Sequence, residues 1–227
     1  MRFVILIFCG FFINKLYGQN SALGSWNILN VRLVHTKKWS YFAEGQIRSL
    51  KFYDNFHYYE IKGGVNFKVN EGFQLTLASG NYQTYKEGGN FVTPKNNNEF
   101  RVWPQIQLSQ NLGKFKVEQR YRAEMRFTSN GYRNRFRYRL LLSRPFGAVR
   151  NEVVPFNVSV SNELFFTDNE PYFERNRLAF NFTYRHSKQV SFMLGYLHQF
   201  DYKINDETGR DFLQIGCYFD LKLKQKD

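Results

Sequence analysis

The stretch from Lys114 to Phe127, KFKVEQRYRAEMRF, alternates between two kinds of side chain at successive positions. Its even positions are all charged, as at Arg120 and Arg126, whereas its odd positions are apolar or aromatic apart from Gln119. Successive side chains of a β-strand point to opposite faces of the sheet. The period of two therefore predicts a strand with one charged face and one apolar face.

The same alternation recurs throughout the chain after its first residues. Turn-forming sequences such as 70–72 and 186–188 separate the alternating runs, and longer polar connections lie at 86–98 and 203–210. The sequence shows no helical period and no internal repeat. The pattern predicts an all-β, antiparallel fold with about eleven candidate strands. The clearest runs cover 26–34, 40–53, 58–69, 99–108, 114–127, 132–142, 156–166, 173–184, 190–202 and 213–223.

The length of these runs favours a membrane barrel over a soluble sandwich, whose strands usually have about 5–6 residues. Transmembrane strands need about 9–11 residues at a tilt of about 45°, and aromatic residues bound their apolar band, which is about 25 Å tall. We therefore expect one antiparallel transmembrane β-barrel of about 10–12 strands with a lumen rich in Arg and Glu. Aromatic residues bracket several runs, namely Tyr41 and Tyr53, Phe115 and Phe127, and Phe156 and Phe166.

The number of strands stays open between two values. Bacterial single-chain barrels have an even number of strands, with short periplasmic turns and longer outer loops. The longer connections follow even-numbered candidates, which would place the C-terminus in the periplasm and start segment 26–34 on the outer side. Because that start is awkward for an exported N-terminus, we expect either ten strands without this segment or twelve with one more.

The first eighteen residues have the layout of a secretory signal peptide. Arg2 precedes a short apolar run, and Gly18 supplies a small residue for cleavage. The run is too short to span a bilayer as a helix. We expect residues 1–18 to be removed and residues 19–227 to form a single domain in the outer membrane of a Gram-negative bacterium. Removal would leave Cys217 as the single cysteine, so no disulfide within the chain is expected.

The chain is both basic and rich in aromatic residues. Its 32 Lys and Arg exceed its 19 Asp and Glu, which gives a formal net charge of +13, and 19% of its residues are aromatic. Segment 135–139, RFRYR, interleaves the two kinds, but strand alternation sends the rings and the guanidinium groups to opposite faces. A nucleic-acid platform would place them on one face. We therefore expect no nucleic-acid partner, and keep a soluble, secreted, basic binding protein as an alternative.

Two tight turns predict which lumenal residues face each other across neighbouring strands. The first is a two-residue turn at 112–113, and the second is a two-residue turn at 130–131. Both preserve the inward phase of the strands that they join. The first turn pairs Glu99 with Arg126, Arg101 with Glu124, Trp103 with Arg122 and Gln105 with Arg120; the second pairs Glu124 with Arg137, Arg122 with Arg139 and Arg126 with Arg135.

These lumenal residues form a predicted ion-pair lattice, in which Glu124 lies between Arg101 and Arg137 and Trp103 stacks on Arg122. We interpret the lattice as filling and neutralising a narrow lumen, because buried charges are normally paired and small barrels are packed. An anion-attracting pore or pocket is the alternative, because arginines outnumber glutamates. The lattice comprises Glu99, Arg101, Trp103, Arg120, Arg122, Glu124, Arg126, Arg135, Arg137, Arg139 and Glu163.

Catalytic and metal-binding patterns are sparse. None of the four histidines has metal-ligand spacing with another His or with a Cys, and no Gly-x-Ser-x-Gly motif occurs. Glu124 is better explained as an ion-pair hub than as a general acid, because arginines flank it. We expect no cofactor, no metal and no enzymatic activity. A lipid-modifying hydrolase stays as an alternative, because some outer-membrane barrels carry a Ser/His pair on their outer wall.

Three segments, taken in order, resemble one bacterial outer-membrane family: 99–105 (EFRVWPQ), 120–127 (RYRAEMRF) and 135–140 (RFRYRL). Their order and spacing carry the resemblance, which covers nearly all of the chain after residue 18. The family is catalogued as domain of unknown function 2490. Further matching pieces are 163–165, 176–178, 195–199, and the opening hairpin with Trp26, Trp39 and 46–48.

The resemblance implies an outer-membrane β-barrel and supplies no activity, substrate or catalytic residue. Pro104 departs from the polar residue that the family tends to have, and we expect a bulge or an unpaired ladder position there, because proline lacks the N–H group. The chain also departs from the usual ending of outer-membrane barrels, because residues 224–227 (KQKD) follow the last predicted strand where a terminal aromatic residue is usual. We expect a monomeric barrel with a structural role or a minor pore or transport role, and with outer-membrane lipids and the outer-membrane assembly machinery as partners.

Overall fold

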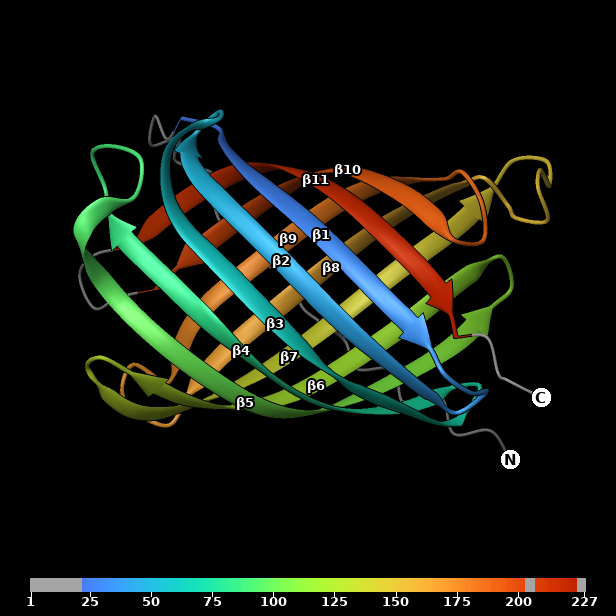
Figure 1. Cartoon of the computed structure of the whole chain (residues 1–227), viewed down its shortest axis with the longest axis horizontal. Helices are drawn as coiled ribbons and strands as arrows, with labels where there is room; N and C mark the ends of the chain where they lie inside the picture. The colour runs from blue at the N-terminus through green and yellow to red at the C-terminus, as the bar shows by residue number, and fades with distance from the viewer. Residues whose placement is uncertain (1–21, 203–206, 224–227) are drawn as a thin grey trace.

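The computed structural model describes residues 22–202 and 207–223, which form eleven β-strands in one closed barrel (Figure 1). The all-β prediction is confirmed, whereas the predicted signal peptide at 1–18 lies outside the described residues. Among those residues, no helix is long and apolar enough to cross a membrane. The strands are β1 (Gly24–Val34), β2 (Trp39–Lys51), β3 (Asp54–Asn70), β4 (Phe73–Lys86), β5 (Val92–Leu112), β6 (Phe115–Thr128), β7 (Gly131–Phe146), β8 (Phe156–Thr167), β9 (Phe173–Arg185), β10 (Val190–Asp201) and β11 (Thr208–Lys222).

Neighbouring strands pair in antiparallel fashion from β1 to β11, and a parallel pair between β1 and β11 closes the barrel. The parallel register runs from Gly24 opposite Phe212 to Val34 opposite Lys222. The eleven strands lie within the predicted range of about 10–12, but the expectation of an even number is wrong, because segment 26–34 belongs to a full strand. Strand direction alternates along the chain, so an odd number of strands gives the first and the last strand the same direction and makes their pairing parallel.

The two ends of the barrel carry different connections. The amino end is where β1 begins, and it has the connections after even-numbered strands; the carboxy end is where β11 finishes. The connection of nine residues at 147–155 lies at the carboxy end, against the expectation that long connections follow even-numbered strands. The connection predicted at 86–98 is shorter than expected, because β5 already begins at Val92 and its first residues, most of them polar, pair with β4. Ladder hydrogen bonds join backbone groups, so polar side chains do not prevent them.

Both predicted tight turns are displaced by one residue. Leu112 pairs with Phe115, and Thr128 pairs with Gly131, so each turn consists of the two residues between the paired ones. Gly113 is the first residue of the first turn and has a φ of 59°. This left-handed value is costly for a residue with a side chain, so the turn begins at Gly113 and not at Leu112. Gly131 follows the second turn with a φ of 110°, as in a type I turn with a G1 bulge. The facing pairs therefore shift by two residues, and the inward face is preserved.

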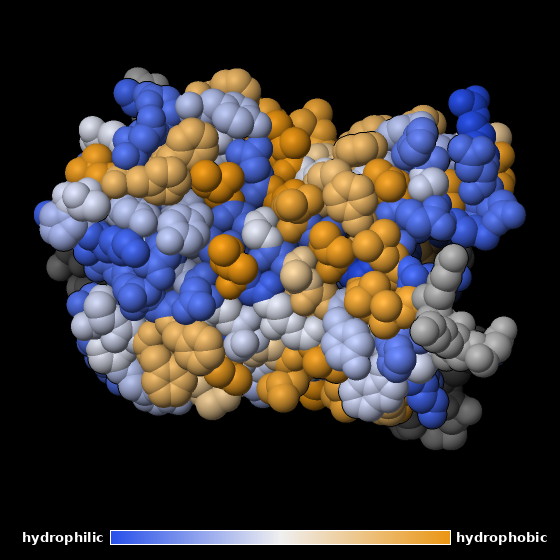
Figure 2. Space-filling view, viewed as in Figure 1, coloured by the Kyte–Doolittle hydropathy of each residue, from blue (hydrophilic) through white to orange (hydrophobic). Residues whose placement is uncertain are grey.

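Strand alternation separates an apolar outer wall from a charged lumen. Ile61 is 65% exposed, whereas the adjacent Glu60 is 3% exposed. Leu77 and Leu194, near the middle of their strands, are likewise exposed on the outer wall. Figure 2 shows apolar side chains spread across this wall. The predicted phases of the strands thus place their apolar residues outside and their charged residues inside.

Exposed aromatic side chains form two belts on the outer wall, one at each end of the barrel. The ring centroids of Trp39 and Phe67 are 4.7 Å apart at the carboxy end, and those of Phe127 and Tyr132 are 5.2 Å apart at the amino end. Aromatic residues therefore bracket the strands, as the sequence predicts. The exposed belt residues are Trp39, Tyr41, Phe115, Phe146, Phe182, Tyr184 and Phe192 at the carboxy end, and Phe52, Tyr53, Phe100, Phe127, Tyr132, Phe166 and Tyr172 at the amino end.

Two irregularities interrupt the ladders near the lumenal residues. The β5–β6 pairing omits Trp103 and Pro104, in agreement with the loss of a ladder N–H group that is expected at Pro104. A register shift in the β8–β9 pairing leaves Glu174 without a residue opposite it in β8. Such a bulge changes the direction of a side chain. As a result, Glu174 and Arg175 both line the lumen although they are adjacent in sequence.

Candidate functional site

Glu124 lies at the centre of a lumenal cluster of arginines. The alternation of β6 turns it inward, and it is 1% exposed. Its carboxylate oxygens lie 2.6 Å from Nη2 of Arg135 and 2.7 Å from Nη1 of Arg137, and the nearest nitrogens of Arg122 and Arg101 lie at 3.4 and 3.8 Å. Arg135 faces Glu124 in the ladder, whereas Arg101 and Arg137 reach it diagonally. The predicted facing pairs are thus wrong, although Glu124 does lie between Arg101 and Arg137.

Glu99 neutralises two arginines that face each other. Arg101 lies opposite Arg126 in the β5–β6 ladder. Glu99 accepts hydrogen bonds from Nε and Nη2 of Arg101 at 2.7 and 2.9 Å, and from Nη2 of Arg126 at 3.0 Å. Because like charges that face each other are unfavourable, the shared carboxylate stabilises this pairing.

Glu163 and Glu118 act in the same way on the next arginines along the wall. Arg120 lies opposite Arg139 in the β6–β7 ladder. Glu163 accepts hydrogen bonds from Nη2 of Arg120 at 2.5 Å and from Nη2 of Arg137 at 2.8 Å. Arg139 donates to Glu118 at 2.6 Å. The arginines of this wall therefore share a smaller number of carboxylates.

Aromatic rings lie between the charged groups of the lumen. The guanidinium carbon of Arg122 lies 5.0 Å from the ring centroid of Trp103, which is the predicted stacking. Phe165 is fully buried, and the guanidinium carbons of Arg137 and Arg177 lie 4.5 and 4.8 Å from its centroid. A cation over an aromatic face is attracted by the negative charge of that face. These rings therefore hold arginines in place without neutralising them.

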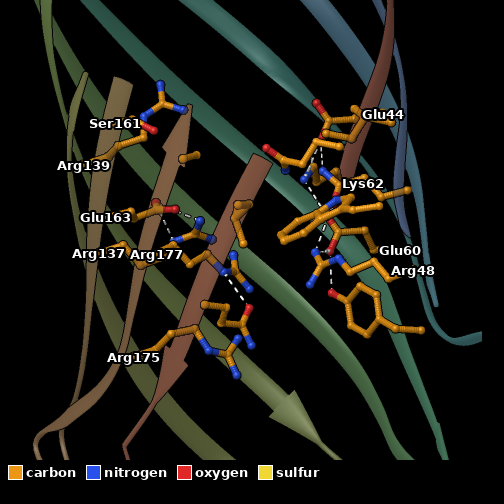
Figure 3. A pocket seen from close by; sticks show the side chains of 18 of the residues that line it. Glu44, Arg48, Glu60, Lys62, Arg137, Arg139, Ser161, Glu163, Arg175 and Arg177 are labelled. Carbon is orange, nitrogen blue, oxygen red and sulfur yellow. Dashed lines mark hydrogen bonds and ion pairs between the residues drawn. The ribbon is translucent and has the colours of Figure 1, made fainter. Parts of the chain in front are cut away.

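A second charged group projects from β2 and β3 on the opposite wall (Figure 3). Arg48 lies 3.0 Å from Glu60, and Nζ of Lys62 lies 2.5 Å from Glu60 and 2.6 Å from Glu44. In Figure 3 this group lies across the lumen from the arginines of β7 to β9. The charges of each wall are therefore paired largely within that wall.

A cavity of about 1380 Å³ remains between the two walls. Its lining includes Glu87 and Asn169 at the amino end, and Gln189 and Asp220 at the carboxy end. Among the described residues that line it, sixteen are Arg or Lys and nine are Asp or Glu. The lumen is therefore less filled than the sequence predicts. The ion pairs hold the walls in place and leave a basic cavity that extends along the barrel.

The model of one protein family matches residues 23–210, and that family is described as protein of unknown function (DUF2490). The chain belongs to this family. The resemblance seen in the sequence is thereby confirmed. No curated protein matches the chain. Since the description of the family names no activity, the lumen of this DUF2490 barrel is the feature that indicates its function.

In the DUF2490 barrel the residues of the predicted lattice either line the cavity or are buried in its wall. Sequence reasoning left out Arg48 and Glu60, although the phase of their strands turns them inward. It also left out Glu174, which lies 3.2 Å from Nη1 of Arg135. No local pattern predicts Glu174, because a bulge determines its direction. Phe165 was likewise left out of the lattice, although it follows Glu163 at an interval of two residues.

Within 22–202 and 207–223, no group of three or more His, Cys, Asp or Glu is placed to hold a metal ion. Cys217 is a free cysteine of β11. The candidate site in the described part of the chain is therefore the basic lumen itself.

Proposed function

We propose that this protein is an outer-membrane β-barrel that forms a narrow pore with a preference for anions. The observation that carries the proposal is the cavity along the closed barrel, whose lining has sixteen basic and nine acidic residues. The sequence favours a purely structural lattice, but the open cavity supports a pore. Rings of Arg and Lys side chains are the means by which pores select anions.

The outer wall supports the membrane part of the proposal. Exposed aliphatic residues such as Ile61 and Leu77 lie between two aromatic belts. A soluble monomer rarely exposes such extended apolar surface, whereas a bilayer would cover it and would place the belts at its two interfaces. A closed barrel has no unpaired sheet edge, which favours a monomer. Lipids and the outer-membrane assembly machinery are then the partners, and residues 1–18 the export signal.

Conductance of the purified barrel in planar bilayers tests the pore. Under a KCl gradient, the reversal potential is expected to lie closer to the equilibrium potential of chloride than to that of potassium. Arg133 lines the cavity near the amino end, so Arg133→Glu should move the reversal potential toward the equilibrium potential of potassium. Arg144 lies over Phe115 on the outer wall, 5.6 Å from its ring centroid, so Arg144→Glu serves as the matched control. Absence of channels, or cation selectivity of the unchanged protein, would refute the pore.

Location is tested separately from conductance. The folded barrel should fractionate with the outer membrane, and unheated and boiled samples should differ in electrophoretic mobility. Recovery from the soluble periplasmic fraction, with equal mobility before and after boiling, would overturn the membrane assignment.

A lipid-modifying hydrolase is the second candidate, because a His/Asp pair lies on the outer wall near the amino end. Nδ1 of His198 lies 2.7 Å from Oδ1 of Asp211, and the hydroxyl of Tyr196 hydrogen-bonds to the same carboxylate. Among the described residues, no serine hydroxyl is hydrogen-bonded to His198. Release of fatty acid from labelled phospholipid, lost in His198→Ala, would establish this activity in place of a pore without catalysis.

A further inference from the structure

Among the described residues, Arg177 differs from the other buried arginines of the lumen because no carboxylate is paired with it. It is 9% exposed and lines the cavity. Its Nε donates to Oε1 of Gln199 at 2.9 Å, and in the described part of the chain no carboxylate lies within 4.0 Å of its guanidinium. A buried charge is costly unless it is paired. Within the described residues, one positive charge of the lumen is therefore left without an ion-pair partner.

The neighbouring strand supplies a carboxylate that is used elsewhere. Glu163 faces Arg177 in the β8–β9 ladder. Its Oε1 instead lies 2.5 Å from Arg120 and 2.8 Å from Arg137. On the other side, Gln199 presents a neutral amide to Arg177 and donates its own N–H to Asp201 at 2.6 Å. Glu163 and Asp201 are thus both paired with arginines other than Arg177.

Two aromatic rings fix the guanidinium of Arg177 in the lumen. Its central carbon lies 4.9 Å from the ring centroid of Trp26 and 4.8 Å from that of Phe165. Arg48 lies over the same Trp26 ring at 3.4 Å, and Arg175 over the same Phe165 ring at 5.8 Å. Figure 3 shows Arg48 facing Arg177 and Arg175 across the cavity. Three guanidinium groups thus converge on one part of the lumen.

The chemistry of this arrangement is that of an oxyanion site. The Nε atom of Arg177 is already used by Gln199, so its terminal nitrogens are left for a ligand. A guanidinium fork matches the two oxygens of a carboxylate or a phosphate group. The rings of Trp26 and Phe165 hold the fork in place before a ligand arrives, which lowers the entropic cost of binding.

We propose that Arg177, flanked by Arg48 and Arg175, is an oxyanion-binding subsite in the half of the lumen nearer the amino end that takes the carboxylate or phosphate group of a small solute. The proposal rests on the proposed pore and deepens it, because the subsite would hold the anion on its passage. An oxyanion at Arg177 would supply the counter-charge that Glu163 and Gln199 do not.

Calorimetric titration of the folded barrel with inorganic phosphate and, separately, with citrate tests the subsite and distinguishes the two chemistries. We expect saturable binding of at least one of the two, weakened at least tenfold in Arg177→Gln. Arg144→Gln, which removes the same charge from the outer wall, should bind as the unchanged protein does. Arg177→Lys keeps the charge and loses the fork, so it should also bind more weakly; it carries the test if Arg177→Gln does not fold.

Conductance in the presence of phosphate or citrate separates this proposal from the pore. Anion binding that depends on Arg177 in a barrel without conductance would retain the subsite and refute the pore. Conductance together with equal affinity in the unchanged protein and Arg177→Lys would retain the pore and overturn the subsite. Absence of saturable binding of both anions would also overturn the subsite.

Discussion

A single carboxylate can hold several arginines in a narrow lumen only if it is desolvated together with them. Glu124 is buried together with four arginines, of which two have a nitrogen within 2.7 Å of its carboxylate and two more have one within 3.8 Å. Replacement by a neutral group would remove a carboxylate that four buried arginines share, and would leave Arg122 with no carboxylate partner among the described residues. By contrast, Glu71 binds Lys68 at the surface, and its side chain is 95% exposed. Water already screens that pair.

At the residue scale, Glu124→Gln is therefore expected to lower the free energy of unfolding by about 3–5 kcal/mol, as is typical when one partner of a buried ion pair is removed. Urea-induced unfolding of the barrel in lipid vesicles, followed by tryptophan fluorescence, measures this difference. The matched control, Glu71→Gln, should cost at most about 1 kcal/mol. Equal effects of the two substitutions would show that the lumenal cluster contributes no more than a surface pair.

Individual hairpins are determined by backbone conformation as well as by side-chain alternation. Gly113 and Gly45 both have open space where a Cβ atom would be added. They differ in backbone, because Gly113 has a φ of 59° in the β5–β6 turn, whereas Gly45 lies within β2. Only Gly113 therefore needs the conformational freedom of glycine.

At the element scale, Gly113→Ala is expected to destabilise the barrel by roughly 1–2 kcal/mol, the cost of a left-handed residue with a side chain. Gly45→Ala should leave stability unchanged or raise it slightly, because it restricts only the unfolded chain. Unfolding midpoints of both variants provide the comparison. A larger effect at Gly45 would contradict the proposed role of the turn conformation.

The connection after β8 should respond to pH. Asp168 accepts hydrogen bonds from the backbone N–H of Asn134 at 3.2 Å and from its side-chain amide at 2.7 Å, and these bonds lower the pKa of Asp168. Because the pKa is lowered in the folded state, protection of the Asn134 amide should be complete above the ordinary Asp pKa of about 3.9 and be lost as pH falls through the lowered value. Hydrogen exchange measures this protection, and Asp168→Asn should abolish its pH dependence.

The closure of the whole molecule depends on one parallel pair. Cys217 of β11 faces Leu29 of β1 in that pair, whereas Val31 faces Phe219. A disulfide requires Cα atoms about 4.4–6.8 Å apart. By contrast, a residue and the diagonal neighbour two positions along the opposite strand are about 7–8 Å apart.

At the scale of the whole molecule, Leu29→Cys should therefore form a disulfide with Cys217 under mild oxidation. Val31→Cys should cross-link far less. Mass spectrometry of non-reduced peptides identifies the product. Cross-linking of Val31→Cys in preference to Leu29→Cys would show a different register at the closure.

Local alternation determined much of this protein. The side chains of a strand alternate by backbone geometry alone, so the sequence indicated the strands, the apolar outer wall and the lumenal position of residues such as Glu99, Glu124 and Glu163. The family could also be inferred, because the order of these segments was enough to reveal a resemblance.

Only the tertiary structure decided how those residues meet. The register depended on a left-handed backbone at Gly113, and the direction of Glu174 on a bulge, neither of which alternation encodes. The parallel closure followed from the odd number of strands. In the described part of the chain, Arg177 has no carboxylate partner because Glu163 is paired with arginines on two other strands. Such choices depend on contacts between distant parts of the chain, whereas the period of two is set within each strand.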